Sequence, residues 1–274
     1  MKVAFWSNTR GRSCVTSNLA CISVLSTLSS SDQRRTIVLE NHQNILNLGN
    51  ALFSQQSRQE VRENKSYQVE YGLSRLLRSM EEGEKLSENT VLRYAENFLG
   101  KKLFYLPAGG TRNQEMLEYR LERECVRTIK FLEQYGDLVL VDTAAAPLAS
   151  SRKILRQADL VVVNLSQNKQ MLDHFFRNYS DIRKKAFYLI GNYDEGSELT
   201  RGEVIKRYEI PGSQLGIIPH NVQFSDALSD GELIPFLLRN YHCGEYDCNY
   251  HFMASAKEAS DLFERQLALA NGGD

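Results

Sequence analysis

The stretch FWSNTRGRS, residues 5–13, contains the residue types that hold a phosphate group. A phosphate-binding loop needs converging backbone N–H groups, a cationic side chain and a Ser or Thr hydroxyl for Mg²⁺. Gly11, Arg12 and Ser13 have the order of a Gly-Lys-Ser/Thr core, with arginine in place of lysine. Arginine binds phosphate, but its fork is longer than the compact ammonium of lysine. The loop alone therefore leaves two interpretations open, a nucleotide loop or an ordinary strand-to-helix turn.

Two further groups have the chemistry of metal ligands. Asp142 ends the apolar run LVLVD (138–142), where a carboxylate can hold a water bound to Mg²⁺. The alternative is a carboxylate that only caps the next turn. The second group is a potential zinc tetrad near the end of the chain: His242, Cys243, Cys248 and His251. Its spacing is not a strong zinc signature, and packing beside the neighbouring aromatic residues is the alternative.

These residues must be positioned by secondary structure, and the sequence contains short apolar runs between them. Such runs are typical of strands buried on both faces of a parallel sheet. They are KVAFW (2–6), TIVLE (36–40), KLFYL (102–106), LVLVD (138–142), LVVVNL (160–165), AFYLI (186–190) and LGIIP (215–219). Helical periodicity separates them, first in CVTSNLACISVLSTL (14–28) and again over about 115–134. The pattern predicts an α/β fold, a doubly wound, mostly parallel sheet with helices on both faces.

We expect one P-loop-like domain over 1–240 and a C-terminal helical tail, 241–274, packed on it. A helix over about 254–270 has an apolar side and an acidic, mixed opposite face, which favours packing over membrane binding. The polar segment 54–97 predicts helices and a mobile loop above the sheet.

Composition narrows the function classes. The net charge is −1 and no polybasic run occurs, which disfavours a nucleic-acid surface. No apolar run approaches the roughly 18 residues of a membrane span, and a polar loop interrupts the first apolar residues, so we expect neither membrane insertion nor a signal region. The five cysteines are scattered and odd in number, as in a reduced cytoplasmic protein.

The whole pattern resembles the MinD/ParA-type ATPases, whose deviant Walker A motif reads K-G-G-x-G-K-[ST]-T, followed by N-L-A. Here Asn18-Leu19-Ala20 matches N-L-A, which places Arg12 at the phosphate lysine and Ser7 at the signature lysine. The resemblance implies binding of ATP or ADP through the loop and Mg²⁺ through Ser13 and Asp142. The loop residues so implicated are Asn8, Thr9, Arg10, Gly11, Arg12, Ser13 and Cys14.

Further landmarks follow in the family's order over residues 2–235. TIVLENHQNILNL resembles the second-strand motif, with Glu40 and His42 at its two aspartates, of which the second positions the attacking water. KLFYLPAGG resembles L-x-V-L-P-A-G, and YGDLVLVDTAAAP resembles the Walker B stretch. Asn192 and Pro219 stand where the family contacts adenine, although Asn192 has the alternative of capping a turn.

Both lysines and the second aspartate are replaced together, which predicts ATP binding with slow or absent turnover. In kind the chain is most similar to the TadZ/CpaE branch, which implies a homodimeric scaffold acting with protein components of a Tad/Flp pilus or secretion apparatus. Such a protein is cytoplasmic, with partners recruiting it to the inner face of the membrane or to a cell pole. That branch often has an N-terminal receiver-like domain, which we expect to be absent or encoded separately.

Two alternatives stay open: an active ATPase in septum placement or DNA partition, and an interaction protein without nucleotide, its pocket closed by an ion pair of Arg12.

Overall fold

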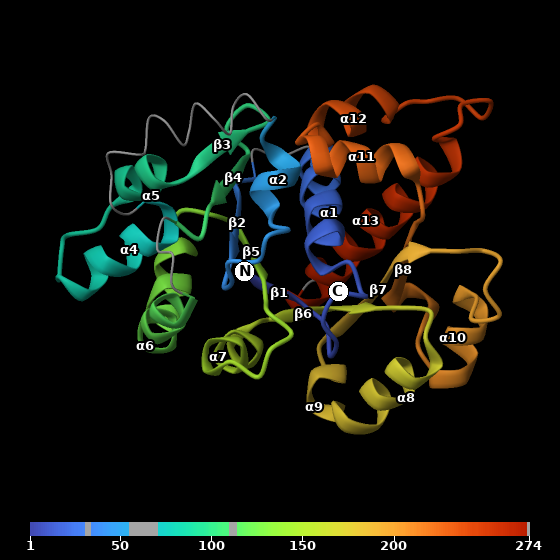
Figure 1. Cartoon of the computed structure of the whole chain (residues 1–274), viewed down its shortest axis with the longest axis horizontal. Coiled ribbons are helices and arrows are strands. Elements are labelled where there is room, and N and C mark those ends of the chain that lie inside the picture. Colours follow the sequence, from blue (N-terminus) through green and yellow to red (C-terminus); the bar gives the residue numbers. More distant parts are fainter. Residues whose placement is uncertain (31–33, 55–70, 110–113, 273–274) are drawn as a thin grey trace.

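The computed structural model describes residues 1–30, 34–54, 71–109 and 114–272. Its centre is an eight-stranded sheet of order β3-β4-β2-β5-β1-β6-β7-β8 (Figure 1). The strands are β1 Lys2–Trp6, β2 Thr36–Glu40, β3 Glu96–Phe98, β4 Leu103–Leu106, β5 Leu138–Asp142, β6 Leu160–Leu165, β7 Ala186–Tyr193 and β8 Leu215–Pro219.

All strand pairs are parallel except β3 with β4, which confirms the predicted doubly wound, mostly parallel sheet. The apolar runs located seven of these strands. The edge strand β3 was not predicted, because its three residues, ENF, show neither an apolar run nor an alternating pattern. Strand β7 runs three residues beyond the predicted AFYLI, to Tyr193.

Helices cover both faces of the sheet, as predicted (Figure 1). One face carries α1 Val15–Ser29, α2 Leu48–Leu52, α11 Val222–Asp230, α12 Leu233–Asn240 and α13 Tyr250–Ala270. The opposite face carries α4 Gly72–Glu81, α5 Glu88–Tyr94, α6 Gln114–Leu132, α7 Ala149–Gln157, α8 Lys169–Asn178, α9 Ser180–Arg183 and α10 Arg201–Tyr208. A 3₁₀ turn, Gly212–Gln214, precedes β8.

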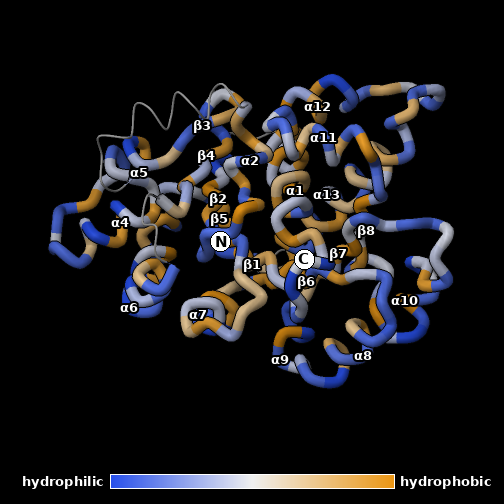
Figure 2. Tube along the Cα trace, in the orientation of Figure 1, coloured by the Kyte–Doolittle hydropathy of each residue, from blue (hydrophilic) through white to orange (hydrophobic). Residues whose placement is uncertain are grey.

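The strands divide their side chains between two cores. In β1, Val3 and Phe5 belong to the core under α1 and α13, whereas Ala4 and Trp6 belong to the core under α6 to α8. This alternation follows from the two-residue period of a strand. Because both faces are buried, the strands are apolar throughout, and Figure 2 shows their hydrophobic colour inside a more hydrophilic rim of helices and loops.

Two predicted helices differ from the observed ones at their ends. The predicted helix over 115–134 is α6, and the predicted last helix begins four residues earlier, at Tyr250. Helix α13 buries one side against α1 and β8. In the polar segment 54–97 the structure has α4 and α5. The expected mobile loop stays a prediction, because residues 55–70 of this segment lie outside the described residues.

None of the described helices combines the length and hydropathy that a membrane span requires.

A glycine-dependent contact joins the end of α11 to the end of α2. Gly231 has φ +75°, and a Cβ at this position would overlap the backbone carbonyl oxygen of Phe53. Gly83, after α4, has a similar φ of +71° with open space around it.

We expect Gly83→Ala to lower the free energy of unfolding by about 1 kcal/mol through its left-handed backbone alone. Gly231→Ala adds the overlap and should cost at least about 1 kcal/mol more. Urea unfolding measures both variants, and equal losses would contradict the close approach.

Candidate functional site

The loop after β1 is held in place by its first residues. Ser7 is fully buried, and its hydroxyl accepts the backbone N–H of Thr9 over 3.3 Å. Asn8 reaches across to α8, where its amide donates to the carbonyl of Met171 at 3.2 Å and lies 3.1 Å from Nδ1 of His174. Positions 7 to 9 therefore anchor the loop, whereas Arg10, Gly11 and Arg12 form its exposed tip.

The loop tip presents a cation to solvent. Gly11 has φ +77°, a left-handed conformation that glycine adopts without steric cost. Arg12 makes no ion pair with any residue that the structure describes, so the pocket-closing ion pair of Arg12 is not formed within that part of the chain. Its guanidinium is available to an anionic ligand.

The start of α1 differs from the helix over 14–28 that the sequence predicts. Cys14 has φ 53°, in the left-handed region, and α1 begins only at Val15. Ser13 is consequently outside the helix, with its side chain buried and its carbonyl accepting from the amide of Asn18 over 3.4 Å. Its role as the Mg²⁺ hydroxyl stays a prediction.

The hydroxyl that meets Asp142 is that of Thr16, which donates to Oδ2 over 2.6 Å. The sequence analysis did not single out Thr16. The signal available was its place in the first turn of the helix after the loop, where a hydroxyl lies near the carboxyl ends of the strands.

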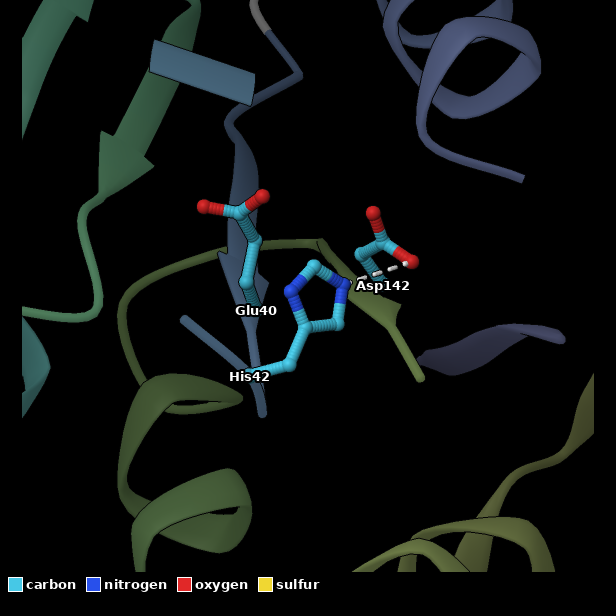
Figure 3. Close-up of side chains that lie close together, drawn as sticks. All are labelled: Glu40, His42 and Asp142. Atoms are coloured by element: carbon cyan, nitrogen blue, oxygen red, sulfur yellow. Dashed lines mark ion pairs between the residues drawn. The ribbon is translucent and has the colours of Figure 1, made fainter. Parts of the chain in front are cut away.

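Asp142, Glu40 and His42 form one cluster at this edge of the sheet (Figure 3). In the parallel pairing of β2 with β5, Glu40 lies opposite Asp142, so both side chains point to the face covered by α1. His42 follows two residues after Glu40, and its Nε2 lies 3.3 Å from Oδ1 of Asp142. All three side chains are buried, and each offers a ligand atom within 4.8 Å of the other two.

Glu40 is fixed from outside the cluster. The Tyr105 hydroxyl donates to Oε2 over 2.6 Å, and the backbone N–H of Leu48 donates to Oε1 over 2.8 Å. Burial and the negative charge of Asp142 raise the pKa of Glu40 to about 7, against the opposing effects of His42 and these two donors.

The pKa of His42 is raised above its ordinary value. Burial lowers this pKa, but the hydrogen bond to Asp142 and the negative charges of Asp142 and Glu40 outweigh that effect. Nε2 of the imidazole faces the carboxylate of Asp142, so position 42 holds a cationic or donor group rather than a carboxylate that could accept from a water.

Buried amides connect the loops around the cluster. Asn41 donates to the hydroxyls of Ser150 and Ser151 and accepts the N–H of Ala144. This ties the loop after β2 to the loop after β5. Sequence reasoning missed Asn41, although a polar residue directly after a buried strand was the available signal.

A second pair of amides supports the region around the loop after β1. Asn18 donates to Oδ1 of Asn164 over 2.8 Å, and Asn164 donates to the carbonyl of Trp6 over 3.3 Å. A Cβ on Gly191 would overlap the amide of Asn18, so β7 passes close to α1.

The predicted adenine contacts lie at the end of β7 and β8. Asn192 sits at a register shift with φ 50°, exposed, and its Oδ1 is 2.8 Å from Nδ1 of His220. Pro219, which ends β8, pairs with Tyr193. Their contact with a base stays a prediction.

The tail tetrad does not assemble. Among the described residues, the only group of three or more potential ligands within reach of one ion is that of Glu40, His42 and Asp142. Cys248 instead lies 3.5 Å from the amide of Gln223.

The raised pKa of Glu40 predicts a pH-dependent stability. Below about pH 7 the folded chain holds a proton that an unfolded glutamate, with an ordinary pKa of 4.5, releases. The free energy of unfolding should therefore fall as the pH rises from about 4.5 to 7, and Glu40→Gln should reduce this fall. Urea unfolding at pH 5 and pH 7.5 measures it, with exposed Glu122→Gln as the control. An unchanged slope in Glu40→Gln would contradict the burial of a titrating carboxyl group.

Comparison with known proteins identifies the fold. No model of a protein family matches the sequence, and no curated protein matches it significantly. Solved structures do match.

A ParA family ATPase from Chlorobium tepidum TLS is similar with a TM-score of 0.69 at 13% identity, over 94% of this chain and 98% of that one. The septum site-determining protein MinD from Pyrococcus horikoshii OT3, complexed with Mg-ADP, gives 0.69 at 12% identity, over 98% and 99%. A putative plasmid partition protein from Borrelia burgdorferi B31, bound to AMPPNP, gives 0.64 at 11% identity, over 97% and 98%. The chain therefore has the fold of the MinD/ParA-type P-loop ATPases.

Proposed function

We propose that this protein binds Mg-ATP or Mg-ADP at the loop of residues 8–14 and acts as a homodimeric scaffold with weak or absent hydrolysis. One observation carries the proposal. The guanidinium of Arg12 stands on the exposed loop tip without an ion pair to any described residue, while Asp142 contacts Thr16 and His42.

Nucleotide binding is supported by the chemistry of the loop and its surroundings. The loop tip offers the exposed backbone of Gly11 and the cation of Arg12 at the carboxyl edge of a parallel sheet, where α/β folds bind ligands. Asp142 and Thr16 supply the carboxylate and hydroxyl that suit Mg²⁺. Structures of the same fold hold Mg-ADP and AMPPNP.

Weak hydrolysis is supported by the groups that stand at the reactive positions. The Ser7 side chain is fully buried, so it cannot supply the cation that a lysine would carry to a bound phosphate. The exposed Arg10 is the available substitute at the tip. His42 gives its Nε2 to Asp142 rather than accepting from a water, so nothing at this position orients the nucleophile for in-line attack.

A scaffold role is supported by an apolar pair beside the site. Ile45 and Leu46 follow His42 in the loop and are 91% and 75% exposed. Adjacent exposed aliphatic side chains suit contact with another protein. We propose a Tad/Flp-type pilus or secretion apparatus as the partner, with recruitment from the cytoplasm to the inner face of the membrane or to a pole; this pathway rests on the sequence resemblance to the TadZ/CpaE branch.

Calorimetric titration with Mg-ATP, together with phosphate release in the same preparation, tests the nucleotide proposal. We expect binding with phosphate release near background. Arg12→Ala should weaken binding at least about tenfold, because a charge-assisted contact to phosphate is lost.

Arg93→Ala is the matched control, since Arg93 is exposed on α5 beside the far edge strand. Release at a rate typical of ATPases of this fold would favour the active-ATPase alternative in septum placement or DNA partition. No binding by the unaltered protein would favour an interaction protein without nucleotide.

The pathway is tested in the native cell. Deletion of the protein should reduce the number of assembled surface pili, and the double variant Ile45→Asp, Leu46→Asp should fail to restore them if the apolar pair contacts the apparatus. Leu269→Asp is the control, because Leu269 is 60% exposed near the end of α13. Unchanged pilus number in the deletion would contradict the pathway and leave the nucleotide proposal standing.

A further inference from the structure

When both of its carboxylates are ionised, the cluster of Glu40, His42 and Asp142 buries more negative than positive charge. Glu40 and Asp142 are each 1% exposed and lie opposite one another in the sheet, and His42 is 4% exposed between them. Within the described part of the chain, neither carboxylate pairs with a lysine or an arginine. Buried charges are normally paired or coordinate a metal, and one imidazole neutralises only one of two carboxylates.

We propose that Glu40, His42 and Asp142 bind a zinc ion directly, in a site that forms without nucleotide. The inference does not require the proposed nucleotide function. Asp142 is shared between the two, however, so zinc at this site and Mg-nucleotide at Asp142 exclude one another.

The distances fit a shared ion. Two ligand atoms that each lie about 2.1 Å from a tetrahedral zinc ion are separated by about 3.4 Å. Nε2 of His42 and Oδ1 of Asp142 are 3.3 Å apart, which matches the separation of two ligands of one ion. A Glu40 oxygen lies within 4.8 Å of both ligand atoms, so only a small approach of Glu40 toward the ion completes the site.

Outer hydrogen bonds hold the ligands in this arrangement. Thr16 occupies Oδ2 of Asp142 and leaves Oδ1 toward His42, while Tyr105 and Leu48 hold one oxygen of Glu40 each. A carboxylate oxygen has two lone pairs, so each Glu40 oxygen can accept one donor and still bind an ion. Such outer partners are typical of protein metal sites, where they orient the ligands.

The donor set selects the kind of metal. Carboxylate oxygens alone suit Mg²⁺ or Ca²⁺, but an imidazole nitrogen beside them favours Zn²⁺. Three protein ligands leave one tetrahedral position for a water or an oxygen anion. On binding, the proton that Nε2 donates to Asp142 leaves to solvent.

Titration of the metal-free full chain with zinc chloride at pH 7.5, by calorimetry and without nucleotide, tests the proposal. We expect one ion per chain with micromolar or tighter affinity. His42→Gln and Glu40→Gln should each weaken binding at least tenfold. The double variant Cys243→Ser, Cys248→Ser should bind as the unaltered chain does, because the tail residues do not gather around one point.

Cobalt substitution of the unaltered chain supplies a readout that needs no variant. We expect ligand-field bands of nitrogen and oxygen ligation without a thiolate charge-transfer band. This readout tests the site even if the glutamine variants do not fold. Absence of zinc binding, a thiolate band, or loss of binding in the cysteine variant would each overturn the zinc site. Mg-ATP binding without zinc binding overturns this inference alone, and zinc binding without Mg-ATP binding overturns the nucleotide proposal alone.

Discussion

The register between β2 and β5 is the constraint on which the candidate site depends. Parallel pairing places Glu40 opposite Asp142, and the two-residue period of the strands turns both carboxylates toward α1. A slip of one residue in one strand would send its carboxylate into the other core. Three further side chains contact this carboxylate pair. The imidazole of His42 lies between the carboxylates, the Thr16 hydroxyl donates to Asp142, and the Tyr105 hydroxyl donates to Glu40.

Buried amide groups keep the loops around this cluster in register with the sheet. Asn41 joins the loop after β2 to the loop after β5, and the Asn18–Asn164 pair joins α1 to the end of β6. A buried amide left without partners is costly, so such networks favour one arrangement of the surrounding loops. The exposed loop tip at Gly11 and Arg12 therefore lies next to a region that these hydrogen bonds hold in one arrangement.

The structure places the groups suited to phosphate apart from the groups suited to activating a water. Groups suited to a phosphate, Gly11 and Arg12, face solvent, whereas the groups that would activate a water are engaged with one another. At position 42 a carboxylate could only accept a hydrogen bond, whereas the imidazole of His42 can donate one and can also supply a nitrogen ligand. This one residue is therefore common to both proposals, weak hydrolysis and a zinc site.

The sequence by itself determined the sheet and much of the site's location. Seven apolar runs predicted seven strands, because strands buried on both faces must be apolar, and Glu40 and Asp142 were located at the ends of two of them. The edge strand β3 escaped prediction, since three residues paired on one side need no hydrophobic pattern. Only the tertiary structure decided which polar side chains meet: it paired Asp142 with Thr16 and His42, left Arg12 without an ion pair among the described residues, and kept the tail cysteines and histidines apart. Such pairings depend on distances between segments far apart in the chain, which strand register and helix packing set and which residue spacing does not encode.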